Sequence, residues 1–404
     1  MKKLLYFLYQ TLLLFGFLGI LFIPFGFKFL SFQSSLSRFL FHDLVNFVGE
    51  KLPFAYIANP EITSDSTTFY LLFAVLFTIA LILTVGLSFV PFWKTHRKKV
   101  ILAIQLVMVY YLSLIMLKYG FDKVFKAQFY LPEPNTLYTP LGMLDKDILY
   151  WSTMGVSRSY NIFLGCLELL PAILLLFQKT RNIGLLILLG VLTHVVWINF
   201  SFDISVKMFS SFLLLLTILL LLPNIKALIT FFLANNPVKL KTYTGVSLVS
   251  TKWLCMSLKS IIIVVFAVEA LGNYVWHSNF NDDEAPRNYL HGAYKVIGLS
   301  THSPNIDLPE IKRIFVHRRN YFIMQYADDT MEDFKLIVDS LGNSLTLINY
   351  DEEELEFTYS FDGTTGELII SNESADITIV TVAIPWRELP ALQPLFHWIV
   401  DGVE

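Results

Sequence analysis

The sequence predicts an all-α polytopic membrane bundle of seven transmembrane helices, followed by a C-terminal antiparallel all-β domain that is either a barrel or a sandwich. The chain has 404 residues, of which 55% are hydrophobic, and a mean hydropathy of +0.58. Its charge is unevenly distributed: residues 1–276 carry 22 Lys and Arg against 11 Asp and Glu, whereas residues 277–404 carry 8 against 22. This asymmetry indicates a membrane part followed by an acidic extramembrane part.

The first apolar stretch, Leu4–Phe27, follows two lysines. It is longer than a signal-peptide core and no A-x-A-like cleavage site follows, so we expect a retained transmembrane helix. In Phe32–Leu52, apolar residues recur at helical spacing between charged ones. This pattern predicts an amphipathic helix, which either lies in the membrane interface or packs on the bundle.

Six more stretches have lengths close to the roughly 20 residues that span a bilayer as a helix. They are Thr68–Phe92, Ile101–Lys118, Ser159–Phe177, Ile183–Phe200, Val206–Leu222 and Leu254–Trp276.

Basic residues cluster in three predicted loops: Lys94–Lys99, the turn with Lys179 and Arg181, and the connection Lys226–Lys252. Because Lys and Arg accumulate on the cytoplasmic side, we expect the amino terminus to be cytoplasmic. The β domain then lies outside the bacterial inner membrane, in the periplasm of a bacterium with an outer membrane.

Four segments follow from these boundaries. Residues 1–99 hold two transmembrane helices and a periplasmic amphipathic helix, residues 100–225 hold a four-helix core, residues 226–276 hold a cytoplasmic connection and the seventh span, and residues 277–404 form the acidic β domain. The loop Tyr119–Arg158 is long and rich in aromatic residues and proline. Loops of this length are usually functional or disordered, and the aromatic residues favour order.

Beyond Trp276 the spacing of the hydrophobic residues changes. Short runs of alternating apolar and polar residues are separated by turn signals such as Ser340–Asn343 and Asp362–Gly366. The eight predicted strands are Tyr294–Ser300, Lys312–His317, Tyr321–Ala327, Asp333–Val338, Ser344–Asn349, Leu355–Phe361, Glu367–Ser371 and Asp376–Ile384. Short connections favour an up-and-down barrel or a sandwich. Trp386–Val400 is expected to be a short helix or an irregular closure. The acidic stretch Asp351–Glu354 is expected to be a solvated turn, since the alternating ligand pattern of a calcium loop is missing.

Other classes of function find little support in the residues. No CxxC motif is present, which argues against a zinc knuckle or a thioredoxin-type redox pair, and Cys166 and Cys255 are predicted too far apart in depth for a disulfide. No basic run with interleaved aromatic residues suggests a nucleic-acid partner.

The polar residues within or at the ends of the central spans are the candidate site, because ionisable groups at membrane depth are costly and are commonly functional. We expect Glu168, His194, Lys123, Asn199, Asp203 and Lys207 to be ligand-binding residues in the outer half of the bundle, with Glu269 at comparable depth. Structural alternatives stay open. Asp203 and Lys207 are spaced as a helix-stabilising i,i+4 pair, and Glu168 could be a buried protonated hydrogen-bond donor. No metal site is predicted, because two candidate ligands on different helices do not make one.

The central stretch contains Gly120-Phe-Asp-Lys123, Gly165-Cys-Leu-Glu168 with Pro171-Ala172, the Thr180-Arg181 and Gly184 turn, and Asn199, Asp203 and Lys207. With these motifs it resembles the DoxX-like family of bacterial four-helix membrane proteins. The likeness covers about residues 101–222. The tail ending in Phe396-His-Trp398 is similar to the β-rich extension of Bacteroidetes-type relatives. The resemblance implies an association with thiosulfate:quinone oxidoreduction or with other membrane redox assemblies.

Two hypotheses of different classes follow, and the sequence leaves open whether the protein is an enzyme. In the first, the bundle binds a lipophilic or quinone-like ligand in its periplasmic half, with Glu168 and His194 hydrogen-bonding the polar head group. In the second, the bundle is a non-catalytic scaffold that presents the β domain to a periplasmic protein partner. Membrane lipids are expected partners in both. A transporter is third, since no paired broken helices or inverted repeat are visible.

Overall fold

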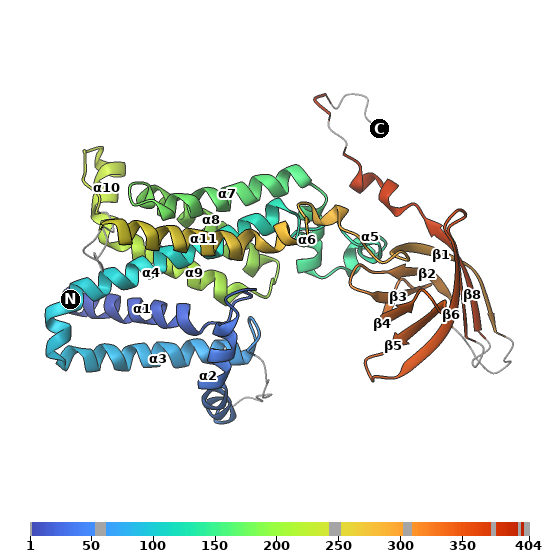
Figure 1. Ribbon diagram of the computed structural model, residues 1–404, viewed down its shortest axis with the longest axis horizontal. Coiled ribbons are helices and arrows are strands. Elements are labelled where there is room, and N and C mark those ends of the chain that lie inside the picture. Colours follow the sequence, from blue (N-terminus) through green and yellow to red (C-terminus); the bar gives the residue numbers. More distant parts are fainter. Residues whose placement is uncertain are drawn as a thin grey trace. The chain divides into compact units, whose positions relative to one another are not determined.

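The computed structural model describes residues 2–52, 62–241, 252–301, 309–372, 377–394 and 397–399 (Figure 1). The contacts divide the chain into two compact units. The helical unit comprises Met1–Gln128 and Ser159–Asp282, and the barrel unit comprises Phe129–Arg158 and Asp283–Glu404.

Seven helices of the helical unit are long and apolar enough to cross a membrane, which confirms the seven predicted spans. They are α1 (Lys2–Phe22), α3 (Thr67–Phe89), α4 (Pro91–Val124), α7 (Arg158–Leu176), α8 (Arg181–Ser201), α9 (Lys207–Leu221) and α11 (Lys252–Trp276).

One predicted loop is wrong, because the basic segment Lys94–Lys99 lies inside α4. Pro91 occupies the first turn of that helix, where its missing N–H leaves no intrahelical bond unmade, and lysine and arginine are good helix formers. At 1.5 Å per residue the 34 residues of α4 extend for about 51 Å. This length exceeds the roughly 30 Å of a hydrocarbon core, so the basic turns at the amino end of α4 can stand in water.

Large apolar side chains from α1, α3, α4 and α9 form the core of the helical unit. Phe15 of α1 lies edge-on to the rings of Phe73 of α3 and Phe212 of α9, at 6.1 and 6.0 Å. Gly16 lets α1 lie close to α4 and α9, because a Cβ there would meet Met108 of α4 at 2.5 Å and Leu216 of α9 at 2.7 Å.

The predicted amphipathic segment is the helix α2 (Phe32–Glu50). Its residues Gln33, Ser37, Phe41 and Val45, one turn apart, are buried and pack on the bundle. A second row of residues on α2 is apolar but exposed, and it includes Phe39, which is 85% exposed. The helix α10 (Ile225–Ala234) lies in a connection where no helix was expected, and Asn235 ends it in the left-handed conformation that commonly terminates helices.

The C-terminal part is a closed eight-stranded antiparallel barrel in which each strand pairs with its sequence neighbour and β1 pairs with β8. This decides between the barrel and the sandwich, and each predicted strand is present. The strands are β1 (Gly292–Thr301), β2 (Ile311–Val316), β3 (Tyr321–Tyr326), β4 (Met331–Asp339), β5 (Ser344–Ile348), β6 (Glu354–Asp362), β7 (Glu367–Asn372) and β8 (Ile377–Ile384).

Apolar side chains fill the interior of the barrel, as is usual for barrels of this size. Tyr294, Ile314, Phe322, Leu336 and Leu368 are among the buried residues of this core. Asp351–Glu354 is exposed, as expected, with Asp351 in a turn and Glu354 as the first residue of β6. After β8 the chain closes with two short 3₁₀ turns, Trp386–Glu388 and Pro390–Leu392.

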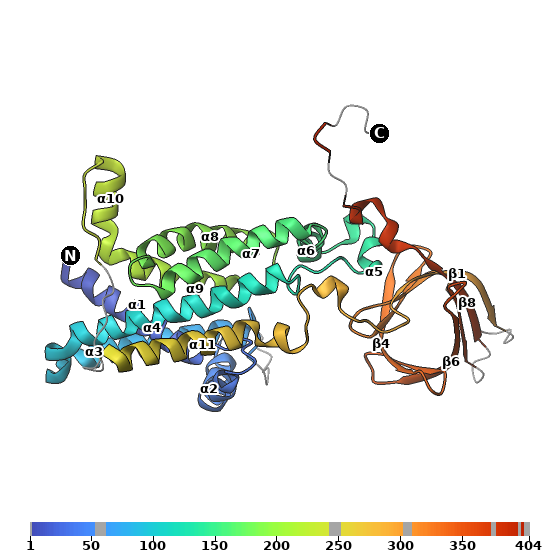
Figure 2. The same ribbon diagram turned by 45° about the horizontal axis from the view of Figure 1, so that its top comes forward.

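The α4–α7 connection, residues 129–158, belongs to the barrel unit. It carries the short helices α5 (Pro134–Leu137) and α6 (Lys146–Gly155). Leu131, Leu137 and Tyr138 pack on the outer wall of the barrel against a second apolar cluster that includes Phe315 and Ile323. Figure 2 shows α5 beside the β1 end of the barrel. The barrel is therefore completed by residues that the sequence places between two membrane-type helices.

Candidate functional site

Lys123 of α4 and Glu168 of α7 form an ion pair in the helical unit. The Lys123 Nζ lies 2.9 and 2.8 Å from the two carboxylate oxygens of Glu168. Both residues are buried. The same ammonium group lies 5.5 Å from the centre of the Tyr119 ring, within the range of a cation–π interaction.

The pair forms where two glycines let α4 and α7 approach closely. A Cβ on Gly165 would lie 2.6 Å from the backbone oxygen of Gly120, and a Cβ on Gly120 would meet the Leu169 side chain at 2.7 Å. Lys123 and Glu168 each follow one of these glycines by three residues. The helices run in opposite directions (Figure 1), and side chains tilt toward the amino end of their helix, so the two charged groups converge on the glycine crossing.

Two further hydrogen bonds hold α4 beside its neighbours. Ser113 Oγ donates to the backbone oxygen of Ala172 in α7 at 2.8 Å, and the Tyr274 hydroxyl of α11 donates to the Asp122 carboxylate. Asp122 is the residue before Lys123. The motif Gly120–Lys123 therefore joins α4 to both α7 and α11.

The structure separates the other predicted site residues from this pair. Asn199 of α8 donates to Ser210 Oγ of α9 at 3.0 Å. Lys207 Nζ lies 2.7 Å from Asp203, as the i,i+4 spacing indicates, and the Lys207 backbone N–H donates to Asp65 at 2.7 Å. The contacts thus join the predicted residues into local groups that each link two neighbouring segments.

His194 stands apart from all of these groups. It is exposed on α8, and it makes no hydrogen bond among the residues that the structure describes. Glu269, expected at the depth of Glu168, has a local role as well. Its carboxylate accepts the backbone N–H groups of Lys28 and Phe29 at 2.7 and 2.9 Å, and of Leu30 at 3.2 Å. It therefore satisfies the backbone of the α1–α2 connection.

The barrel unit contains a charged cluster that the sequence did not indicate. Glu133, just before α5, lies 2.8 Å from His291 Nε2 and accepts the backbone N–H of Arg318 at 3.1 Å. The Arg318 guanidinium stacks 4.1 Å from the Tyr130 ring. Burial works to raise the pKa of the Glu133 carboxyl, but the hydrogen bond and charge of His291 outweigh it and hold this pKa below its usual range. The cluster fastens the α4–α7 connection to the barrel.

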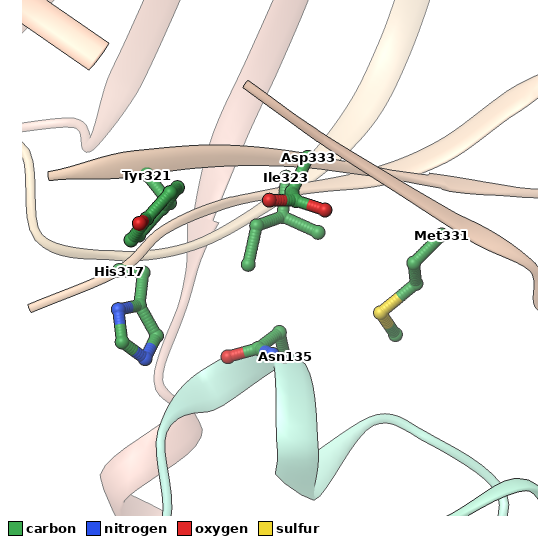
Figure 3. A pocket seen from close by; sticks show the side chains of 6 residues that line it. All are labelled: Asn135, His317, Tyr321, Ile323, Met331 and Asp333. Carbon is green, nitrogen blue, oxygen red and sulfur yellow. The ribbon is translucent and has the colours of Figure 1, made fainter. Parts of the chain in front are cut away.

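A hollow of about 270 Å³ lies beside this cluster, between α5 and the outer face of β3 and β4. Figure 3 shows Asn135 on one side of it and Asp333 and Ile323 on the other, with His317 and Met331 at its two ends. Tyr321 completes the lining. The side-chain oxygen of Asn135 is buried without a hydrogen-bond partner.

The lining of the hollow is mostly apolar and carries one negative charge, that of Asp333. His317 Nδ1 accepts the Arg319 backbone N–H at 3.1 Å, so the proton of the neutral ring sits on Nε2. Burial lowers the pKa of His317, which keeps the ring neutral at pH 7. Within the described ranges, no three His, Cys, Asp or Glu side chains gather as a metal site.

Comparison with known proteins gives one partial relative. Over 71 residues the chain is 37% identical to an uncharacterized protein, YwoB, of Bacillus subtilis (strain 168). The match covers 18% of this chain and 46% of that protein, so the chain spans less than half the length of the relative. No family model and no solved structure matches the chain.

Proposed function

We propose that this chain is a multi-pass protein of the bacterial inner membrane that acts as a non-catalytic scaffold and holds its barrel unit in the periplasm for a protein partner. The observation that carries the proposal is the construction of the barrel unit from two separate parts of the chain. Residues 129–158 emerge between α4 and α7, and the strands follow α11. A domain that only trails from a membrane anchor needs no such insertion.

The bundle supports the same proposal through its buried charges. Lys123 is compensated by Glu168, and Glu269 is compensated by three backbone N–H groups. Buried groups that satisfy one another in this way need no ligand to compensate their charges. Placement of the barrel in the periplasm rests on the basic residues of Lys94–Lys99, the 179–181 turn and the connection after α9.

A second candidate function keeps the resemblance to the DoxX-like family. In it, the bundle binds a lipophilic or quinone-like ligand as part of a redox-associated assembly. The observation in its favour is the cost of a buried ion pair, since well-packed apolar residues would stabilise the α4–α7 contact equally well or better. A role for Lys123 and Glu168 toward a ligand head group would account for that cost.

Photo-crosslinking in cells that make the native chain tests the first proposal. Benzoylphenylalanine is placed at Leu341 or Tyr350, which are exposed on the barrel, and, as a control, at Trp197, which is exposed on α8. The scaffold proposal expects the barrel positions, and not Trp197, to crosslink one defined protein.

Mass spectrometry of the co-purified small molecules tests the second candidate on the same full-length protein. A quinone or other lipid that is present in wild type and lost in Glu168→Gln supports ligand binding in the bundle. That result, together with absent barrel crosslinks, would overturn the scaffold proposal.

A further inference from the structure

The hollow between α5 and the barrel combines an apolar base with hydrogen-bond acceptors. Ile323 and Met331 supply the apolar contact, while Asp333 and the buried, unpartnered oxygen of Asn135 supply acceptors. An acceptor buried without a donor is destabilising. A ligand whose donor meets this oxygen after a rotation of the Asn135 side chain would remove that cost.

The size of the hollow limits the ligand. Its volume of about 270 Å³ is below the roughly 300–1,000 Å³ of pockets for drug-sized molecules. This space suits one long side chain or a small amine.

The lining of the hollow favours a cation, and one opposing charge beside it is that of Arg319, which acts to lower the pKa of His317. Asp333 is the acid of the lining, and one of its oxygens accepts the Tyr350 hydroxyl at 2.7 Å. His317 is neutral, as argued above. Lys335 follows Asp333 on the same face of β4, but it is exposed and forms no ion pair with Asp333 among the described contacts. The part of the chain after residue 276 carries 22 acidic against 8 basic residues, which attracts basic partners over a longer range.

We propose that this hollow binds a lysine or arginine side chain of the partner protein. The aliphatic part of that side chain lies along Ile323 and Met331, and its charged end donates to Asp333 and to the Asn135 oxygen. Long basic side chains commonly bury their stem on apolar surface in this way. The proposal rests on the scaffold function and names the chemistry by which the barrel recognises its partner.

The test titrates the full-length protein in detergent with Nα-acetyl-lysine methylamide and follows the ¹³C-labelled methyl group of Met331 by NMR. The chain has 9 methionines, so Met331→Leu assigns the signal. We expect saturable shifts with a dissociation constant on the order of millimolar, because a single side chain is a small ligand. The uncharged norleucine analogue should give no saturable shift.

Variants locate the binding. Asp333→Asn and Asn135→Ala should each weaken binding of the lysine probe at least tenfold. Asp351→Asn is the matched control, because it removes one acid from an exposed turn of the same barrel. An equal loss in Asp351→Asn, or unchanged binding in Asp333→Asn, would overturn the proposal. Tighter binding of free cadaverine than of the peptide-like probe would reassign the hollow to a small amine.

Crosslinking separates failure of this inference from failure of the scaffold function. Benzoylphenylalanine at Tyr321, in the lining, should capture the same protein as at Leu341, and Asp333→Asn should abolish capture at the first position while sparing the second. If both positions capture the partner regardless of Asp333, the scaffold function stands and the hollow is not the recognition site. If neither position captures a protein, the scaffold function itself fails.

Discussion

Lys123 and Glu168, 45 residues apart in the chain, neutralise each other inside the helical unit with contacts of 2.9 and 2.8 Å. Removing one partner of a buried pair leaves an uncompensated charge and costs about 3–5 kcal/mol. Lys123→Met and Glu168→Leu should therefore each lower the thermal stability of the detergent-solubilised protein strongly. The double variant should recover most of the loss, which a melting curve followed by size-exclusion chromatography measures. A double variant as unstable as the sum of the singles would contradict a purely structural pair.

The close approach of Gly120 and Gly165 predicts a steric effect at the same crossing. Gly165→Ala places a Cβ 2.6 Å from a backbone oxygen that cannot rotate away, so α4 and α7 must separate and the ion pair must lengthen. We expect a loss of stability in the range of about 1–3 kcal/mol that overpacking typically causes. The matched control is Gly190→Ala in α8, where nothing lies within 4 Å. That substitution should be neutral or stabilise the helix by up to about 1 kcal/mol. Equal melting temperatures for both variants would argue against a tight contact between α4 and α7 at Gly165.

Local patterns predict the spans and strands, but they miss the helical course of Lys94–Lys99 and the helix α10, and they do not show which side chains meet. Long apolar runs and alternating strands follow from local periodicity, so the seven spans and eight strands could be recognised. The sequence groups Glu168 with His194 because their depths along the predicted helices agree. Depth along a helix does not determine the direction in which a side chain points. The rotation of α8 about its axis leaves His194 exposed. The Glu133–His291 contact joins residues 158 apart in the chain, and no local pattern indicates such a pair.

The pH dependence of the barrel unit follows from Glu133 and His317. The folded-state pKa of Glu133 is lowered, mainly by His291 acting against burial, and burial lowers that of His317. A group with a lowered pKa stabilises the fold above its unfolded-state pKa, and this contribution is lost as the pH falls through the folded value. For both groups the loss therefore occurs on the acid side, below about pH 6.5 for His317 and below about pH 4.3 for Glu133.

Hydrogen exchange of backbone amides measures this loss of stability on acidification. Amides of residues 129–138 should lose protection on acidification before those of the barrel strands. In Glu133→Gln these amides should be less protected at pH 7, and the part of the pH dependence below about pH 4.3 should flatten. Protection that is independent of pH in the native chain would show that the cluster does not control this segment.

The apolar wall under the α4–α7 connection predicts how the isolated strands behave. In a fragment of residues 283–404, Phe315 and Ile323 lose their cover from Leu131, Leu137 and Tyr138. Exposed apolar patches of this kind cause association, so the fragment should bind a hydrophobic dye and elute as oligomers. Phe315→Ser in the fragment should reduce both effects, since it removes a large ring from the uncovered wall. The same substitution in the full-length chain should destabilise, because there Phe315 is buried against Tyr138 with ring centres 5.9 Å apart. The diagnostic result is that Phe315→Ser reduces association of the fragment but lowers the stability of the full-length chain. A fragment that is monomeric and dye-free without the connection would mean that residues 129–158 cover the barrel without being needed for its solubility.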